Sequence, residues 1–85
     1  MITAAQMRAA RALAGIDQKT LAERAGVSLP TIQRMEASDG VVRGVVDTLM
    51  KVIAALEASG VELVSEGQVS ERGGRGVRLR LPPSV

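Results

Sequence analysis

The sequence of 85 residues contains no cysteine, no histidine and no aromatic residue. Without cysteine, disulfides and thiolate chemistry are excluded. Without histidine, the usual general base and the commonest metal ligand are missing, and no D-x-D-x-D spacing gathers the carboxylates around a cation. Without Phe, Tyr or Trp, the chain cannot stack on unpaired bases, which argues against single-strand nucleic-acid binding. We therefore expect no enzyme activity, no metal and no cofactor.

Long apolar runs and a strong charge excess are also missing. No apolar stretch is long enough to span a membrane. We also expect no secretory signal peptide, because no basic segment followed by an apolar one stands at the start of the sequence. We therefore expect a cytoplasmic protein of a bacterium or phage, with no membrane partner. The net charge of +2 is a weak indication of nucleic-acid binding. With 46% hydrophobic and 24% charged residues, the chain is typical of one small globular domain. Because so small a core gives marginal stability, we also expect a partner subunit.

The first helix is predicted in "TAAQMRAARALAG", residues 3–15. Thr3 and Gln6 have the spacing of a capping box, and Gly15 suits the position after the helix end. The predicted apolar face comprises Met7, Ala10, Leu13 and Ala14.

Two short helices are predicted next, in "DQKTLAERA", residues 17–25, and "SLPTIQRME", residues 28–36. Asp17 and Ser28 are suitable N-caps, and Gly26 ends the first of the two helices. The predicted apolar stripe of the first comprises Leu21, Ala22 and Ala25. In the second, Ile32 and Met35 point one way, Pro30, Gln33 and Arg34 point the other way, and Leu29 and Thr31 lie on the flanks.

A fourth helix is predicted in "VVDTLMKVIAALEASG", residues 45–60, after a loop, "ASDGVVRG". Its apolar positions are Val46, Leu49, Val52, Ile53 and Leu56. Beyond Gly60 the period changes, because "VELV" and "VRLRL" alternate apolar and polar residues as half-buried strands do. The expected fold is therefore mainly helical, with four helices in a DNA-binding domain over residues 1–60. A pair of strands or a hairpin with a Gly-rich loop follows in residues 61–85.

Two short helices joined by a tight turn that contains glycine are the helix-turn-helix signature. Ala22 must be small where the helices cross, and Gly26 allows the sharp turn. Val27 and Ile32 fill the angle, and Ser28 leaves the first amides of its helix facing outward, where a phosphate can bind.

On these residues, positions 4–58 resemble the Cro/C1-type (XRE family) DNA-binding domain of phage repressors and small bacterial regulators. The residues that carry the resemblance are Gln18, Leu21, Ala22, Ala25, Gly26, Val27, Ser28, Ile32 and Glu36, with "VDTLMKVIAAL" as the packing helix. The resemblance implies a surface laid into the major groove for base readout, formed by Leu29, Pro30, Thr31, Gln33 and Arg34. It implies contacts with the DNA backbone from Gln18, Lys19, Ser28 and Arg43. It also implies a structural salt bridge between Arg11 and Glu36.

The side-chain chemistry suggests how this surface reads bases. Arg34 can pair with guanine O6 and N7, and Gln33 with adenine N6 and N7. Leu29 and Pro30 depart from the polar residues that many family members place there, and can pack against thymine methyl groups. Alternatively, Gln33 and Arg34 form an ordinary solvated helix face, and Leu29 flanks the core or contacts a protein partner.

The arginines of "ERGGRGVRLRL" also allow two interpretations. They can reach a DNA backbone as an arm, or Arg78 and Arg80 can form the wet side of a strand whose Val77, Leu79 and Leu81 face inward; the regular alternation favours the second. Two strands alone are marginal in water. We therefore expect the tail to pair with that of a second subunit through Val61, Leu63, Val77, Leu79 and Leu81.

We predict a transcriptional regulator that binds double-stranded DNA. It would be cytoplasmic, and associated with the nucleoid when bound to DNA. It would be a repressor, acting as a homodimer on a palindromic operator and without a separate ligand-binding domain. One alternative is the antitoxin of a toxin–antitoxin pair, which would bind a toxin, regulate its own operon and co-purify with an unrelated small protein. The possible protein partner is thus a toxin or another regulator. Another alternative is a protein-interaction module, whose affinity for duplex DNA would lack steep salt dependence.

Overall fold

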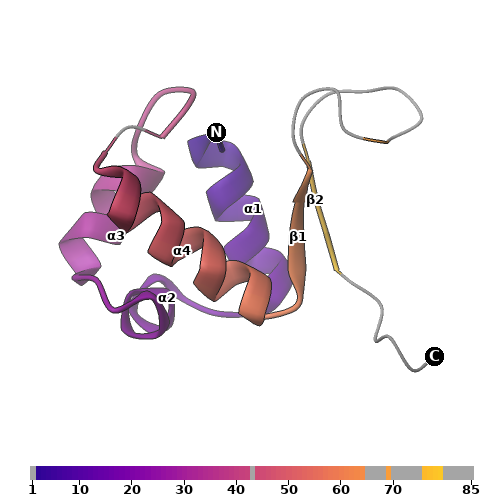
Figure 1. Cartoon of the computed structure of the whole chain (residues 1–85), viewed down its shortest axis with the longest axis horizontal. Helices are drawn as coiled ribbons and strands as arrows, with labels where there is room; N and C mark the ends of the chain where they lie inside the picture. The colour runs from indigo at the N-terminus through magenta and orange to yellow at the C-terminus, as the bar shows by residue number, and fades with distance from the viewer. Residues whose placement is uncertain (1, 43, 65–68, 70–75, 80–85) are drawn as a thin grey trace.

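The computed structural model describes residues 2–42, 44–64, 69 and 76–79. As predicted, four helices are followed by a two-stranded antiparallel sheet. The elements are α1 (Ala4–Ala14), α2 (Gln18–Ala25), α3 (Leu29–Glu36), α4 (Val46–Ala58), β1 (Val61–Val64) and β2 (Gly76–Leu79). In Figure 1, α3 and the sheet lie at opposite ends of the molecule, with α1 and α4 between them. None of the described helices is long and apolar enough to cross a membrane.

The predicted helix caps are present. In α1, Thr3 Oγ1 accepts from the Gln6 backbone amide at 3.0 Å. Gln6 Oε1 accepts from the Thr3 backbone amide at 2.9 Å, which completes the capping box. Asp17 caps α2, and its hydrogen bond from the Thr20 backbone amide lowers the pKa of the Asp17 carboxyl below its usual value. Its stabilising effect is therefore present above the usual carboxyl pKa and is lost as the pH falls through the lowered value.

The first testable prediction concerns this capping box. Replacing Thr3 with alanine should lower the free energy of unfolding by about 0.5–2 kcal/mol, because an orphan amide of α1 loses its acceptor. Duplex affinity should not change once the protein is folded, because Thr3 lies in none of the surfaces expected to contact DNA. Urea denaturation and a binding titration would check the two parts separately.

The core lies between the helices and one face of the sheet. Its largest fully buried side chains are Met7, Leu21, Ile32, Val52, Leu56 and Val61. Two sequence predictions were wrong here, because Leu13 is 40% exposed and Val46 is 66% exposed. The buried line of α1 runs through Met7 and Ala10, so Leu13 lies beyond its edge. The core direction of α4 is set by Leu49, Val52 and Leu56, so Val46 lies to one side.

The segment between α3 and α4, expected only to be a loop, pairs with the start of the chain. The Val42 amide donates to the Ile2 carbonyl and the Ala4 amide donates to the Gly40 carbonyl, each at 2.9 Å. Both Ile2 and Val42 are buried in the core. This pairing fixes the connection from α3 to α4 against the first residues of the chain.

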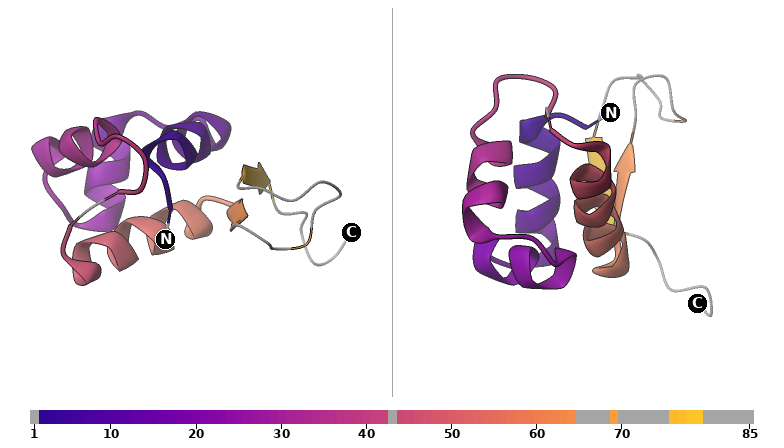
Figure 2. Two further views of the ribbon diagram at one scale, coloured as in Figure 1. Left: turned by 90° about the horizontal axis from the view of Figure 1, so that it is seen from above. Right: turned by 60° about the vertical axis from the view of Figure 1, so that its left-hand side comes forward.

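The sheet lies against α1 and the end of α4, on the side of the molecule away from α3 (Figure 2). The register pairs Val61 with Leu79 and Leu63 with Val77. Val61 is fully buried, and Leu63 and Val77 pack partly buried against the same core. These three side chains are therefore used within the chain. For Leu79 only the backbone is described, and Leu81 lies outside the described residues.

The outward face of the sheet carries an ion pair. Arg78 Nε and Nη2 donate to the two carboxylate oxygens of Glu62, at 2.9 and 2.8 Å, directly across the strands. Arg78 thus lies on the wet side of its strand. The other arginines of this stretch, Arg72, Arg75 and Arg80, lie outside the described residues.

Candidate nucleic-acid interface

The turn between α2 and α3 has the geometry that the sequence predicted. Gly26 has φ +69°, a backbone conformation that side-chain-bearing residues rarely adopt, and it is followed by a hydrogen bond from the Val27 amide to the Ala22 carbonyl at 3.0 Å. Ala22 and Ile32 are buried, and Val27 packs against them from a half-buried position. The two helices are consequently held at a fixed angle by small and β-branched side chains.

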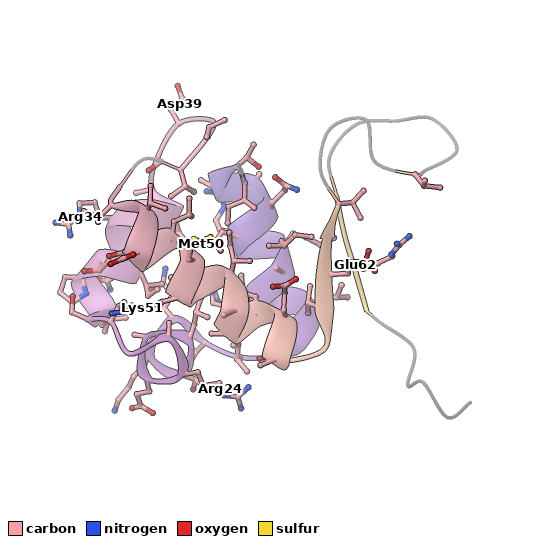
Figure 3. All side chains as sticks on the ribbon, in the orientation of Figure 1. Arg24, Arg34, Asp39, Met50, Lys51 and Glu62 are labelled. Carbon is pink, nitrogen blue, oxygen red and sulfur yellow. The ribbon has the colours of Figure 1, made fainter. Side chains whose placement is uncertain are left out.

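One side of α3 faces outward and is mostly polar. Pro30, Gln33 and Arg34 are exposed, whereas Leu29 and Thr31 are half-buried on its flanks. Arg34 projects away from the body of the molecule in Figure 3. Within the described part of the chain, the Arg34 guanidinium and the Gln33 amide have no hydrogen-bond or ion-pair partner. Both groups are therefore available to a ligand.

The start of α3 is organised by two hydroxyl groups. Ser28 Oγ accepts from the Thr31 amide at 3.2 Å, and the two side-chain hydroxyl oxygens are 2.7 Å apart. The hydroxyl of Thr31 is therefore paired with the cap residue. Lys19 lies exposed near the start of α2. Arg43, expected to contact the DNA backbone, lies outside the described residues.

A buried carboxylate anchors α3 from behind. Glu36, 4% exposed, accepts from Arg11 Nε at 2.9 Å and from Arg11 Nη2 at 3.0 Å, so the pair is bidentate. This contact raises the pKa of Arg11, chiefly through the side-chain hydrogen bond. Gln18 Nε2 also donates to Glu36 Oε1 at 3.2 Å, and Arg8 Nη1 donates to the Glu36 carbonyl. One carboxylate thus joins α1, α2 and α3.

The resemblance implied the pair of Arg11 with Glu36, but not the two further donors. Gln18 was expected only to contact a phosphate. Its amide has two N–H groups, and the bond to Glu36 uses one of them. The other remains available, so this contact orients the Gln18 amide without excluding a phosphate. The contact of Arg8 depends on how α1 packs on the end of α3, for which the sequence pattern gave no signal.

A shallow groove borders the exposed side of α3. It has a volume of about 210 Å³ and lies between α3, the following connection and the start of α4. Its wall is formed by Thr31, Arg34, Met35, Val42, Gly44, Val45, Thr48 and Leu49. Arg34 therefore lies on the outward face of α3 and also lines this groove.

The comparisons with known proteins agree with this geometry. No curated protein matches the chain. The family model described as "Helix-turn-helix domain" matches residues 3–64, which contain all four helices and the first strand. Such domains bind DNA and are typical of regulators that are not enzymes. Because the match covers well over half of the sequence, the chain belongs to the helix-turn-helix domain family.

Proposed function

We propose that the chain is a transcriptional regulator of the Cro/C1 (XRE) type that reads a specific sequence in double-stranded DNA. The observation that carries the proposal is the outward side of α3, where Arg34 and Gln33 are exposed and unpaired within the described residues. A free guanidinium on a solvated helix is common by itself. Here the helix that carries it is fixed to α1 and α2 through Glu36, so its position relative to the rest of the domain is defined.

Rigid support matters because base readout depends on geometry. Arg34 can donate two hydrogen bonds to guanine O6 and N7, and Gln33 can pair with adenine N6 and N7. Each good pair discriminates against a wrong base by about 1–3 kcal/mol. A helix that rocked on its core would lose these contacts, so the buried ion pair serves readout without touching DNA.

The remaining residues of the proposed surface have different roles. Leu29, Pro30 and the methyl group of Thr31 can contact thymine methyl groups in the major groove. Gln18, Lys19 and Ser28 lie at the starts of α2 and α3, where phosphates are favoured by free amides and by the helix dipole. Arg43 is proposed to contact the same backbone.

The proposed mechanism is repression by occlusion. One recognition helix buries little surface, so a single copy of the domain should bind a specific site weakly. Two copies related by a two-fold axis would present their α3 helices about 34 Å apart, one turn of DNA, and so match a palindromic operator. A dimer bound there would exclude polymerase from the promoter.

The direct test of readout is the Arg34→Ala variant. A binding sequence is first selected from a pool of random duplexes with the wild-type protein. On that duplex the variant should bind about 5- to 150-fold more weakly, which corresponds to about 1–3 kcal/mol, because its bidentate base contact is lost. Its melting temperature should not change, because Arg34 is exposed.

Arg24→Ala is the matched control for this test. Arg24 is also an exposed helical arginine, but it lies at the end of α2 and donates to Ser59 Oγ at 3.1 Å, away from the outward side of α3 (Figure 3). The Arg24→Ala variant should bind the selected duplex with the affinity of the wild type. Equal losses in both variants would mean that the arginines act only through net charge. Wild-type affinity that does not fall steeply with salt would count against DNA binding itself.

A further inference from the structure

The outward face of α4 carries an apolar row that the core does not use. Val46 is 66% exposed and Met50 is 57% exposed, and Ala54 and Ala58 are exposed one and two turns further on. The four residues recur at intervals of four along a single helix. In Figure 3, α4 lies at the front of the molecule, where Met50 and Lys51 are labelled. Val46 and Met50 are exposed large apolar side chains, and with the two alanines they form a continuous apolar row of the kind that can serve as an interaction surface.

We infer that this apolar row of α4 is the surface on which a second copy of the chain docks, with the two α4 helices antiparallel about a two-fold axis at Met50. The inference deepens the proposed function, and rests on it only where operator binding is concerned. The strand side chains Val61, Leu63 and Val77 pack at least partly on their own core, which leaves less of their apolar surface for a subunit contact than the row on α4 offers.

The sizes of the side chains fit this arrangement. In an antiparallel pair about Met50, each residue lies opposite the one equally far on the other side of Met50. Val46 therefore lies opposite Ala54 of the second copy, so a larger side chain meets a smaller one in both halves of the contact. Rows spaced by four residues are also the ridges that interlock in the commonest class of helix packing, with axes crossing at about −50°.

The charges fit as well. Asp47 and Lys51 are exposed and lie one turn apart, on the same edge of the apolar row. A two-fold axis between antiparallel helices keeps that edge on the same side in both copies. Measured along the helix axis, each Asp47 then lies about 3 Å from Lys51 of the second copy. The reason is that their distances from Met50 differ by two residues, at a rise of about 1.5 Å per residue. Within the described part of one chain, neither residue has an ion-pair partner.

This surface lies on the same side of the molecule as α3. Val45, just before α4, is 70% exposed and lines the groove that also contains Thr31 and Arg34. A second copy on α4 would therefore lie beside the recognition helix. The sheet is at the opposite end of the molecule (Figure 1).

The first experiment measures mass by sedimentation equilibrium of the full chain without DNA, over a range of concentrations. The wild type should show twice the chain mass of 8.9 kDa. Met50→Glu should raise the dimer dissociation constant by about 100-fold or more, because two carboxylates meet at the axis. Glutamate is a good helix former at an exposed position, so the variant should keep its helical circular dichroism. Leu13→Glu, at an exposed apolar position on α1, is the control and should remain a dimer.

A charge exchange gives a second, independent readout. Asp47→Lys and Lys51→Asp should each weaken the dimer by about 3- to 30-fold, because like charges then face each other across the axis. The double exchange should restore the wild-type dissociation constant to within about 3-fold, since the pairs re-form with reversed sign. A contact elsewhere, such as pairing of strand edges, would show no such restoration.

Several results would overturn the inference: a wild type that is monomeric at every concentration, a Met50→Glu variant that dimerises unchanged, or a double exchange no better than the single ones. These results are distinct from failure of the proposed function. If the wild type is monomeric but still binds duplex DNA with steep salt dependence, only the inferred α4 contact is wrong. If the dimer behaves as expected but does not bind duplex DNA, only the proposed regulator function is wrong.

Discussion

Replacing Arg11 with methionine should lower the free energy of unfolding by about 3–5 kcal/mol, a loss measurable by urea denaturation. The reason is the asymmetry of the pair with Glu36, whose side chain is 3% exposed, whereas that of Arg11 is 23% exposed. The variant leaves a carboxylate in the interior, and among the described residues the Gln18 amide is then its one remaining side-chain donor. Since a domain of this size has marginal stability, much of the population should unfold at ambient temperature.

The chain provides a matched control for this prediction. Glu62 and Arg78 form an ion pair with the same bidentate geometry, but their side chains are 28% and 55% exposed. Arg78→Met should therefore leave the free energy of unfolding nearly unchanged, because solvent screens this more exposed pair. The double variant Arg11→Met, Glu36→Leu should recover part of the loss, since no unpaired charge is left inside. If the Arg11 and Arg78 variants were equally stable, burial of Glu36 would not be the cause.

Gln6→Glu should be the second most damaging change, lowering the free energy of unfolding by about 2–4 kcal/mol because two buried acceptors lose their donor. Gln6 is 6% exposed, and its Nε2 donates to the carbonyl oxygens of Val64 at 3.0 Å and of Gly76 at 3.2 Å. A carboxylate keeps the acceptor that the Thr3 amide needs, but it cannot donate to the two carbonyls. The variant therefore tests the attachment of the sheet separately from the capping of α1. It loses about two hydrogen bonds and adds repulsion between the carboxylate and the two carbonyl oxygens.

The pH dependence of this variant gives a sharper test. Burial and two facing carbonyls disfavour the charged form, so the pKa of the introduced carboxyl should be higher in the folded than in the unfolded chain. Stability relative to the wild type should then be lowest above the raised pKa, recover as the pH falls through that value, and be fully recovered below the unfolded value, because the protonated acid can donate. At neutral pH, amides in β1 and β2 should exchange faster in the variant than in the wild type, and this ratio of rates at matched pH should approach one on acidification.

Gln33→Glu makes the same chemical change at an exposed position and serves as the control for stability. It should alter the free energy of unfolding by less than about 0.5 kcal/mol at any pH. A loss in Gln6→Glu confined to α1, with unchanged exchange in the strands, would contradict the role given to the two carbonyl contacts.

Only some of the hydrogen bonds of Gln6 follow from the local sequence. The spacing of Thr3 and Gln6 was enough to predict the capping box, because both partners lie within one helical turn. The same glutamine bonds to residues 58 and 70 positions away, which no local pattern indicates. Likewise, the signature around Gly26 predicted the turn into α3, since its conformation depends on the backbone of a few residues.

Burial was harder to predict than helix position. Periodicity placed Val46 and Leu13 on apolar faces, yet both are exposed. The apolar part of each helix is wider than the strip that its neighbours cover, so the sequence alone does not say which edge is buried. For Val46 the outcome matters, because its exposure created the apolar row from which the α4 contact is inferred.

The sequence by itself determined the caps, the glycine turn, the order of four helices and two strands, and the polar side of α3, because these depend on backbone hydrogen bonds and side-chain periodicity over a few residues. The tertiary structure alone decided that Glu36 gathers donors from α1 and α2, that Gln6 holds the sheet and that an apolar row of α4 remains uncovered. Those features arise where segments far apart in the chain meet, and the packing of one segment on another is what determines which polar groups find partners and which apolar groups do not.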